Sequence, residues 1–248
     1  MRKHFFAIMI TLVFAMNANA TTWGPAKHKC PICDKTSTYQ EIMSYGGYIY
    51  QWPSKFQYIF WPLTDNPSVY CCPNCFFSTY MWDFDSIPDI KLDTIKAFLQ
   101  TVEHQTFKDY RDIPMTTRLG IAEKIYQILG RDTEFWCKFY RVKGYHYSLS
   151  KMENQALESR TKALVLARNM LSDSTYVGRE KEQFFIIAAM FNFTNHQDSA
   201  LVYLNKASSC KYQNKNIPEE NSTNLDEYLG DIINQYKEII EKGKSIEE

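Results

Sequence analysis

Cys30-Pro31-Ile32-Cys33 and Cys72-Pro73-Asn74-Cys75 are two copies of one short pattern, CPxC, and they decide the fold of the N-terminal part of the chain. A CxxC turn places its two sulfur atoms on one side of the chain, so two turns that face each other offer four thiolates to one ion. Zn²⁺ prefers this tetrahedral arrangement of ligands. The pattern therefore predicts a structural zinc site with Cys30, Cys33, Cys72 and Cys75 as its ligands.

A glycine commonly follows the second cysteine of such a turn, because the chain there tends to need a positive φ angle. In this sequence Asp34 and Phe76 stand at the two positions. Aspartate adopts the left-handed region more readily than phenylalanine does. We therefore expect the second turn to be more distorted than the first.

The first twenty residues have the pattern of a cleaved signal peptide. Arg2 and Lys3 precede an apolar run over residues 5–16, and Ala18-Asn19-Ala20 follows as a small-residue cleavage site. The run is shorter than the about 20 apolar residues that usually cross a bilayer, so a retained anchor is the less favoured alternative. The sequence predicts cleavage after Ala20 and a periplasmic or secreted chain without a stable membrane anchor.

The charges of the chain argue against two classes of partner. Its 28 basic and 28 acidic residues balance, and loss of the leader takes the formal net charge to about −2. Neither nucleic acid nor an anionic membrane surface is favoured by that balance.

Export raises the question of the redox state of the seven cysteines. Oxidising compartments convert CxxC pairs into disulfides unless a metal protects the thiolates, so disulfides within or between the two pairs stay open as an alternative. Cys137 lies in an aromatic helical stretch and is expected to be a small buried residue. Cys71 is either a spare thiol or an alternative ligand, and Cys210 is left over.

Few polar residues offer acid or base chemistry. We expect Glu103-His104 to lie on a solvent-exposed helix face. Asp83, near Asp85, is expected to cap a helix or to bond the backbone of the cysteine turn. His28 lies two residues before Cys30, but four cysteines suffice for the metal, so we expect an exposed histidine. Motifs of hydrolases, phosphate-binding loops and dinucleotide-binding folds are missing from the sequence, which leaves enzymatic activity uncertain and less favoured.

Aromatic and β-branched residues between the two cysteine pairs predict short strands over residues 45–52 and 56–61, and residues 69–71 lead into the second turn. Residues 21–29 are expected to form an extended lead-in to the first turn. After residue 85 the apolar period lengthens to that of a helix. Helices are predicted over 90–110, 115–129 with Gly130 as its C-cap, 133–148 and 153–171, and a last helix is predicted to be capped by Asn224.

The spacing of apolar residues from 184 to 207 fits the tetratricopeptide pattern, in which small residues mark the contact of two helices. The matching residues are Phe184, Ile187, Ala188, Phe191, Ala200, Leu204 and Ala207. A weaker copy lies 44 residues earlier, with Tyr140, Gly144, Tyr147, Ala156 and Ala163 in place, but with charged Lys143 and Arg160 where apolar residues belong. An ordinary antiparallel helical bundle is the alternative, since three repeats are normally needed for a stable array.

The predicted fold is mainly α. A signal peptide (1–20) precedes a small zinc-stapled β module, ribbon-like, over residues 21–88, and an antiparallel, tetratricopeptide-like helical array covers 89–248. The two CPxC turns, the aromatic segment before Pro62-Leu63, and Asp83-Phe84 ahead of the helical tail together resemble the bacterial family called domain of unknown function 2225. The resemblance spans nearly all of the mature chain and implies the same four cysteines as metal ligands. It implies an architecture and no reaction.

Two functions follow from these patterns. The first is an exported structural-zinc protein that acts as an adaptor and holds a protein or peptide on the concave face of its helical repeat. The alternative is an envelope thiol redox protein that uses one CxxC pair as an active disulfide. Reactive CxxC pairs usually open a helix, and neither pair here is followed directly by a helix start, which favours the adaptor.

Overall fold

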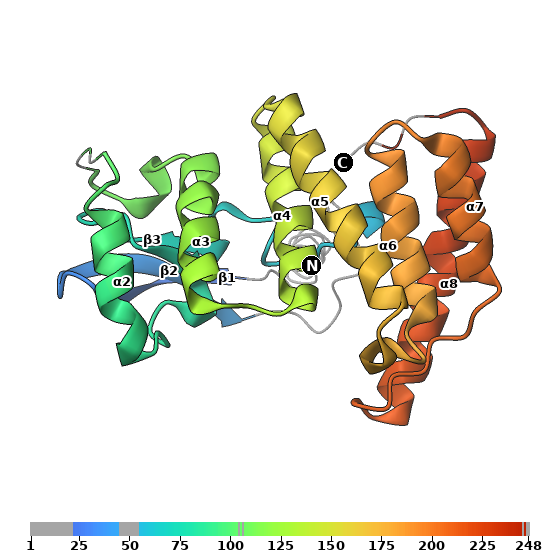
Figure 1. Cartoon of the computed structure of the whole chain (residues 1–248), viewed down its shortest axis with the longest axis horizontal. Coiled ribbons are helices and arrows are strands. Elements are labelled where there is room, and N and C mark those ends of the chain that lie inside the picture. Colours follow the sequence, from blue (N-terminus) through green and yellow to red (C-terminus); the bar gives the residue numbers. More distant parts are fainter. Residues whose placement is uncertain (1–21, 45–54, 104, 106, 245, 247–248) are drawn as a thin grey trace, which may run out of the picture.

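The computed structural model describes residues 22–44, 55–103, 105, 107–244 and 246 of the chain. The predicted signal peptide, the predicted strand at 45–52 and His104 lie outside these residues. Two antiparallel β-hairpins come first and helices follow, as Figure 1 shows. The strands are β1 (Thr22–Lys29), β2 (Thr36–Ser44), β3 (Val69–Cys71) and β4 (Ser78–Tyr80). The α-helices are α2 (Asp89–Leu99), α3 (Met115–Leu129), α4 (Thr133–Leu149), α5 (Glu153–Leu171), α6 (Glu180–Asn192), α7 (Gln197–Ser208) and α8 (Glu219–Glu241).

The predicted class, mainly α with a small β module at the N-terminus, is confirmed. The module differs in detail from the prediction. The stretch expected as a lead-in is strand β1, and it pairs with β2 from Thr22 opposite Ser44 to Lys29 opposite Thr36. The sequence of β1 contains a glycine and a proline and few β-formers, so its strand conformation comes from pairing across the first cysteine turn.

The predicted strand at 56–61 is wrong. Residues Lys55–Gln57 form a short 3₁₀ helix, and Tyr58 has a φ of 56°, which no strand allows. The Phe56 and Tyr58 rings are buried against α8 and α6, while the half-buried Trp61 ring contacts Trp23 of β1. Burial by helices therefore overrides the β-propensity of these residues.

Two helix boundaries also differ from the prediction. Helix α2 ends at Leu99 and not near 110, and there the Thr101 hydroxyl donates to the Phe98 carbonyl at 2.7 Å, in competition with further helical bonds. Helix α8 begins at Glu219, after Pro218, so Asn224 lies inside the helix and does not cap it. The other three predicted helices match α3, α4 and α5 closely, and Gly130, at a φ of 74°, is the left-handed C-cap of α3.

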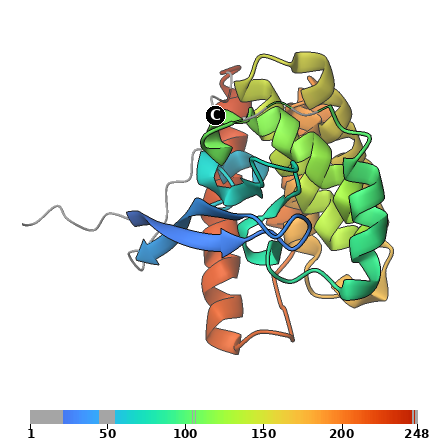
Figure 2. The ribbon, with the colours of Figure 1, turned by 90° about the vertical axis from the view of Figure 1, so that its left-hand side faces the viewer.

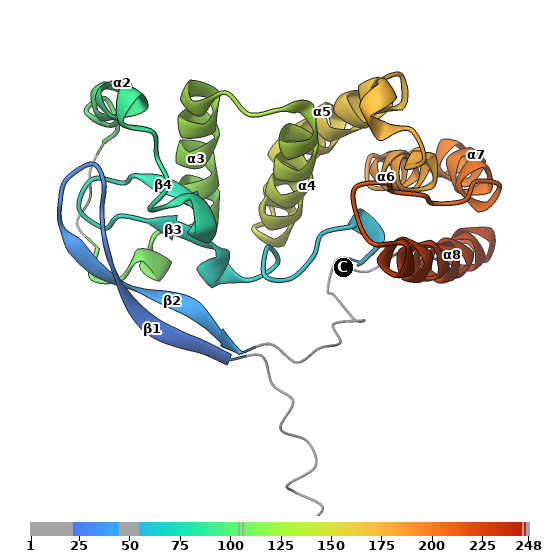
Figure 3. The ribbon, with the colours of Figure 1, turned by 90° about the horizontal axis from the view of Figure 1, so that it is seen from below.

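Helices α2 and α3 cover the β module, and the helices from α4 onward follow along the molecule (Figures 2 and 3). One buried cluster joins Cys30 and Cys72 with Ile95 and Leu99 of α2 and with residues of α3. A second cluster joins α5 to α8 with Phe56, Tyr58 and Cys137, and a third joins β3 and β4 to α3 and α4. The core of the cysteine module thus extends into the first two helices.

Helices α4 and α5 form one close hairpin, and α6 and α7 form another, with α8 packed beside them (Figure 1). In the described part of the chain no helix is both long enough and apolar enough to span a membrane.

Residues 55–60 connect the two halves of the molecule. Phe56 packs on Tyr236 of α8 with ring centroids 4.6 Å apart, and Tyr58 packs on Phe185 of α6 at 5.8 Å. The Arg141 guanidinium, on α4, donates to the carbonyls of Gln57 and Tyr58. In Figure 3 this segment runs from the β module to α8. The inner side of α4, α6 and α8 therefore already holds a stretch of the chain itself.

Candidate metal centre

The two CPxC turns occupy equivalent positions in the two β-hairpins. The first connects β1 to β2, and the second connects β3 to β4. In the first turn the Cys30 N–H donates to the Lys35 carbonyl at 2.9 Å, and the Asp34 N–H donates to the Cys30 carbonyl at 3.0 Å. The second turn repeats both bonds at 2.8 Å, from Cys72 to Phe77 and from Phe76 to Cys72. Each strand pair thereby presents two cysteines at its tip.

The residues in place of the expected glycines adopt the left-handed conformation. Asp34 has a φ of 60° and Phe76 a φ of 63°, so the two turns have the same backbone shape. The expected distortion of the second turn is therefore wrong. The Phe76 ring is buried, and it contacts the Phe107 ring at a centroid distance of 5.9 Å. Burial of the ring offsets the cost of about 1–2 kcal/mol for a non-glycine residue in this region.

The four sulfur atoms converge on one point between the hairpins. All four lie within 4.8 Å of one another. The Cys30 Sγ to Cys75 Sγ distance is 3.6 Å, as is the distance from Cys33 Sγ to Cys72 Sγ. Four sulfurs about 2.3 Å from a central ion in a tetrahedron would be roughly 3.8 Å apart. The donor set therefore fits one tetrahedral metal ion.

None of the cysteines among the described residues is in a disulfide. A disulfide would require a sulfur separation of about 2.05 Å, well below the distances between the hairpins. The alternative of a disulfide-linked cluster is not what this structure contains.

The thiols depend on one another for ionisation. Hydrogen bonds from the Cys30 and Cys75 thiols lower the pKa of Cys72, while hydrogen bonding to Cys30 and to Cys72 raises the pKa of Cys75. Hydrogen bonding to Cys72 likewise raises the pKa of Cys30. The Cys72 thiolate is thus favoured, and Cys30 and Cys75 resist ionisation because negative charge would accumulate. A divalent cation at the centre supplies the charge that four thiolates need.

Two of the four cysteines are shielded from solvent, and aromatic rings pack next to the cluster. Cys30 and Cys72 are buried, whereas Cys33 and Cys75 are half-buried. Beneath them the Tyr39 ring stacks on Tyr70 with centroids 4.4 Å apart. Because Tyr39 lies in β2 and Tyr70 in β3, this stacking joins the two hairpins.

The remaining cysteines stay out of the cluster. Cys71 is fully buried, and its thiol points to the Cys72 carbonyl at 3.9 Å, so it is a spare thiol and not an alternative ligand. Cys137 is buried in α4, and its thiol donates to the Ala163 carbonyl at 3.6 Å, as expected for a small core residue. Cys210 is half-buried after α7.

His28 is not the exposed residue that the sequence predicted. Its side chain is only 15% exposed, and its two ring nitrogens lie 2.6 Å from Asp85 Oδ2 and 2.7 Å from Glu41 Oε1. The ring also contacts Tyr39 edge-on. The two carboxylates and the Tyr39 ring hold His28 beside the first cysteine turn. His28 is not part of the sulfur cluster.

Asp83 does not cap a helix or bond the turn backbone, contrary to the sequence-based expectation. Its Oδ2 accepts the Tyr126 hydroxyl at 2.7 Å, and its Oδ1 pairs with Arg131 at 2.9 Å. Asp83 and Asp85 thus serve separate partners, and Glu103 is exposed. These interactions tie α3 to the module, and sequence spacing offers no signal for them.

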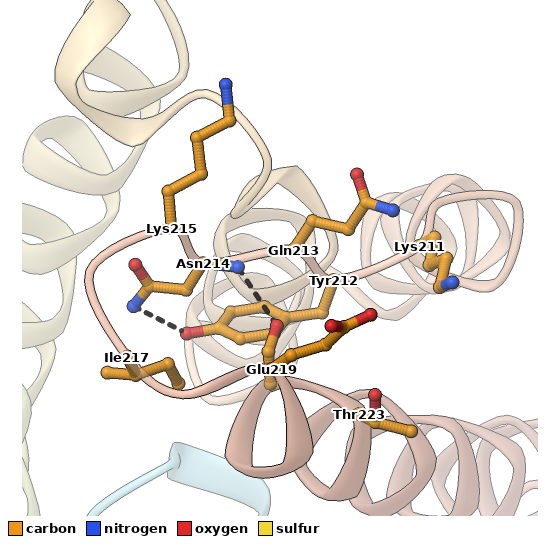
Figure 4. A pocket seen from close by; sticks show the side chains of 9 residues that line it. Lys211, Tyr212, Gln213, Asn214, Lys215, Ile217, Glu219 and Thr223 are labelled. Carbon is orange, nitrogen blue, oxygen red and sulfur yellow. Dashed lines mark hydrogen bonds between the residues drawn. The ribbon is translucent and has the colours of Figure 1, made fainter.

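A surface hollow of about 390 Å³ lies at the start of α8 (Figure 4). The Asn214 N–H donates to the Ser222 hydroxyl at 3.0 Å, and the Asn214 side-chain amide donates to the Tyr212 hydroxyl at 3.2 Å. Asn214 thus bonds within the loop that connects α7 to α8, and it holds this loop against the start of α8.

No protein-family model, curated protein or solved structure matches this chain. The resemblance to the domain of unknown function 2225 family therefore stays a prediction that rests on the motifs alone.

Proposed function

We propose that this chain is an exported adaptor whose N-terminal module is held by structural zinc and whose helices bind a protein or peptide. The observation that carries the metal half is the convergence of four free cysteine sulfurs from two equivalent hairpins. Zinc suits this set because thiolate ligands in a tetrahedron are its preferred structural site. Cys30, Cys33, Cys72 and Cys75 would hold the ion, and with no open position the ion would stabilise the module only.

Cys72→Ser tests the metal. Purified wild-type protein should contain one zinc per chain, and the variant should contain well under half, because a hydroxyl is a poor zinc ligand. Since metal-binding energy is folding energy for such modules, the thermal transition of the N-terminal part should be lost while helical circular dichroism largely remains. Cys210→Ser is the matched control at a half-buried cysteine outside the cluster, and it should keep full zinc. Wild-type protein without zinc, unchanged by chelators, would contradict the proposal.

The helical half of the proposal rests on the two close hairpins. Ala188, Ala200 and Ala207 are fully buried where α6 meets α7, as are Ala156 and Ala163 between α4 and α5. These are the small-residue contacts that the tetratricopeptide pattern requires.

The two charged residues that fit the pattern poorly have partners. The Arg160 guanidinium lies over the Phe193 ring at 5.0 Å, and Lys143 pairs with Glu123. Both charges are thereby accommodated at positions that the repeat normally gives to apolar residues, which supports α4 and α5 as a first repeat.

The binding face we favour is the exposed side of α5. Leu157 and Val165 are 45% and 52% exposed, and they lie on one face of this helix because eight residues separate them. The inner side of α4, α6 and α8 is less suited, since residues 55–60 occupy it.

A photo-crosslinking residue at position 165 tests this face. In cells we expect a specific crosslinked product that Leu157→Glu abolishes, because a charge at the centre of an apolar contact is not compensated. The same crosslinker at position 90, on the highly exposed Ile90 of α2, is the control and should give no such product. Equal products at both positions would argue against an adaptor face on α5.

Export and redox state are tested together on the native protein. N-terminal sequencing should begin at Thr21 if the leader is cleaved after Ala20. Thiol titration separates the adaptor from the envelope thiol redox alternative. Four thiols that react only after a chelator is added support zinc, and one fast-reacting thiolate supports the redox role.

A further inference from the structure

A second pocket, of about 400 Å³, lies between residues 58–60, the start of α4 and the start of α6. Its apolar walls are the rings of Tyr58, Phe60 and Phe135. Its volume is within the range of small-molecule sites, which are mostly apolar with a few placed polar groups. The question is which chemistry those polar groups would recognise.

The carboxylates at the pocket are already engaged. Arg179 binds both oxygens of Glu134, at 2.7 and 3.3 Å, and its Nε binds Glu182 at 2.8 Å. Asp132 caps α4 by accepting the Phe135 N–H at 2.7 Å. One arginine and one helix terminus thus neutralise much of the negative charge around the pocket.

The two cationic side chains at the pocket, Lys138 and Arg141 of α4, differ from these carboxylates in their partners. Within the described residues neither Lys138 nor Arg141 forms an ion pair with a carboxylate, and no hydrogen bond of the Lys138 ammonium is found there. Arg141 is 94% buried, with its Nε and Nη1 donating to the carbonyls of Cys137, Gln57 and Tyr58, which leaves Nη2. Burial and then the neighbouring Arg141 lower the pKa of Lys138, as expected of two adjacent cations that lack a shared anion.

We propose that this pocket binds the carboxylate of a small organic acid, with the acid group between Lys138 and Arg141 and its apolar part against Tyr58, Phe60 and Phe135. A singly charged carboxylate suits the site better than a phosphate, because three protein carboxylates border the pocket and would repel a second negative charge. The proposal does not rest on the adaptor role, since neither the four cysteines of the metal centre nor the exposed side of α5 contributes to the pocket.

Isothermal titration of the full chain with 3-phenylpropionate tests the site, with 3-phenylpropionamide as the uncharged counterpart. We expect the acid to bind at least tenfold more tightly than the amide, because the charge-assisted bonds are lost with the amide. Lys138→Gln should weaken binding of the acid roughly tenfold or more, and Lys138→Arg should keep it within a few-fold. Lys124→Gln, at an exposed lysine of α3, is the matched control and should bind as wild type.

Three results would overturn the assignment. These are equal binding of acid and amide, unchanged binding by Lys138→Gln that keeps its zinc and circular dichroism, and inorganic phosphate competing at equal concentration. A short peptide with a free C-terminal phenylalanine, compared with its amidated form, distinguishes the source of the acid. Tighter binding of the free-acid peptide than of 3-phenylpropionate would support a chain terminus as ligand, and weaker binding would support a small molecule.

Discussion

At the scale of single residues, a buried arginine stabilises the backbone of segments that lie far apart in the sequence. Arg118 is fully buried in α3, and it donates to the carbonyls of Ile113, Asn66 and Val69 at 2.7 to 3.0 Å. These carbonyls belong to the segments that lead into α3 and β3 and to the first residue of β3. Arg118 therefore replaces the hydrogen bonds that a regular strand or helix would have supplied to these segments.

His146 is the residue for which the structure predicts a pH dependence. Its Nε2–H donates to the Leu63 carbonyl at 2.8 Å, and burial, which outweighs this bond, lowers its pKa to about 4. Unfolded histidine titrates near 6.5, so between these values only the unfolded state binds the proton. Stability should therefore fall as the pH drops from about 6.5 toward 4. From pH 7.5 to 5.5 the loss from this residue should be roughly 1.4 kcal/mol.

Urea unfolding of His146→Gln at the two pH values measures this contribution. Glutamine can still donate to the Leu63 carbonyl but does not titrate, so the variant should lose less stability than wild type by that amount. His196→Gln, at an exposed histidine, should show the wild-type difference. The interpretation fails if His146→Gln and wild type depend on pH equally.

At the scale of elements, close approach between segments depends on a few positions without a side chain. Gly144 of α4 faces α5, where an added Cβ would lie 2.9 Å from the Arg160 Cγ. Gly178, before α6, has a φ of 89° and accepts the Gln213 N–H at 2.6 Å. The segment after α7 can therefore pack directly on the backbone before α6.

Gly178→Ala should destabilise the helical half strongly. A Cβ at this position would lie 2.1 Å from the Gln213 carbonyl oxygen, so the segment would have to move as well as adopt a strained backbone. Gly130→Ala is the matched control, because Gly130 has a similar φ of 74° and no atom within 4 Å of an added Cβ.

The control should cost about 1 kcal/mol for the left-handed backbone alone, and Gly178→Ala should cost roughly 2 kcal/mol more because of the clash. Thermal unfolding midpoints of the two variants provide the measurement. Similar midpoints for both would mean that the contact at Gln213 does not constrain the fold.

At the scale of the whole molecule, the metal module and the helices share two connections. Helices α2 and α3 contribute to the core around Cys30 and Cys72, and residues 55–60 insert between α4, α6 and α8. The exposed end of the second connection is tied by Lys55, whose ammonium donates to the Gln235 side chain at 2.9 Å. Loss of the metal should therefore affect more of the chain than residues 21–88.

Hydrogen exchange with and without a chelator tests how far this influence extends. Amides of α2 and α3 should exchange at least tenfold faster after metal removal, since their apolar faces cover the cysteine module. Amides of α6 and α7, which pack in a separate cluster, should change little and serve as the internal control. Protection of α2 and α3 that survives chelation would place the boundary near residue 88, as the sequence predicts.

The amino-acid sequence by itself determined the features that depend on local spacing. Patterns within short stretches of chain predict the four cysteine ligands, the helices α3, α4 and α5, and the Gly130 cap.

Contacts between distant segments were decided only by the tertiary structure. The segment 55–60 has strand-like residues, yet it is buried between helices because Arg141, Phe185 and Tyr236 offer its carbonyls and rings better partners. No local sequence pattern predicts three further contacts between segments. These are the pairing of β1 with β2, the placement of His28 between Glu41 and Asp85, and the pocket at Lys138. Hydrophobic burial and backbone hydrogen bonding are satisfied over the whole chain at once, and local propensity yields wherever they conflict.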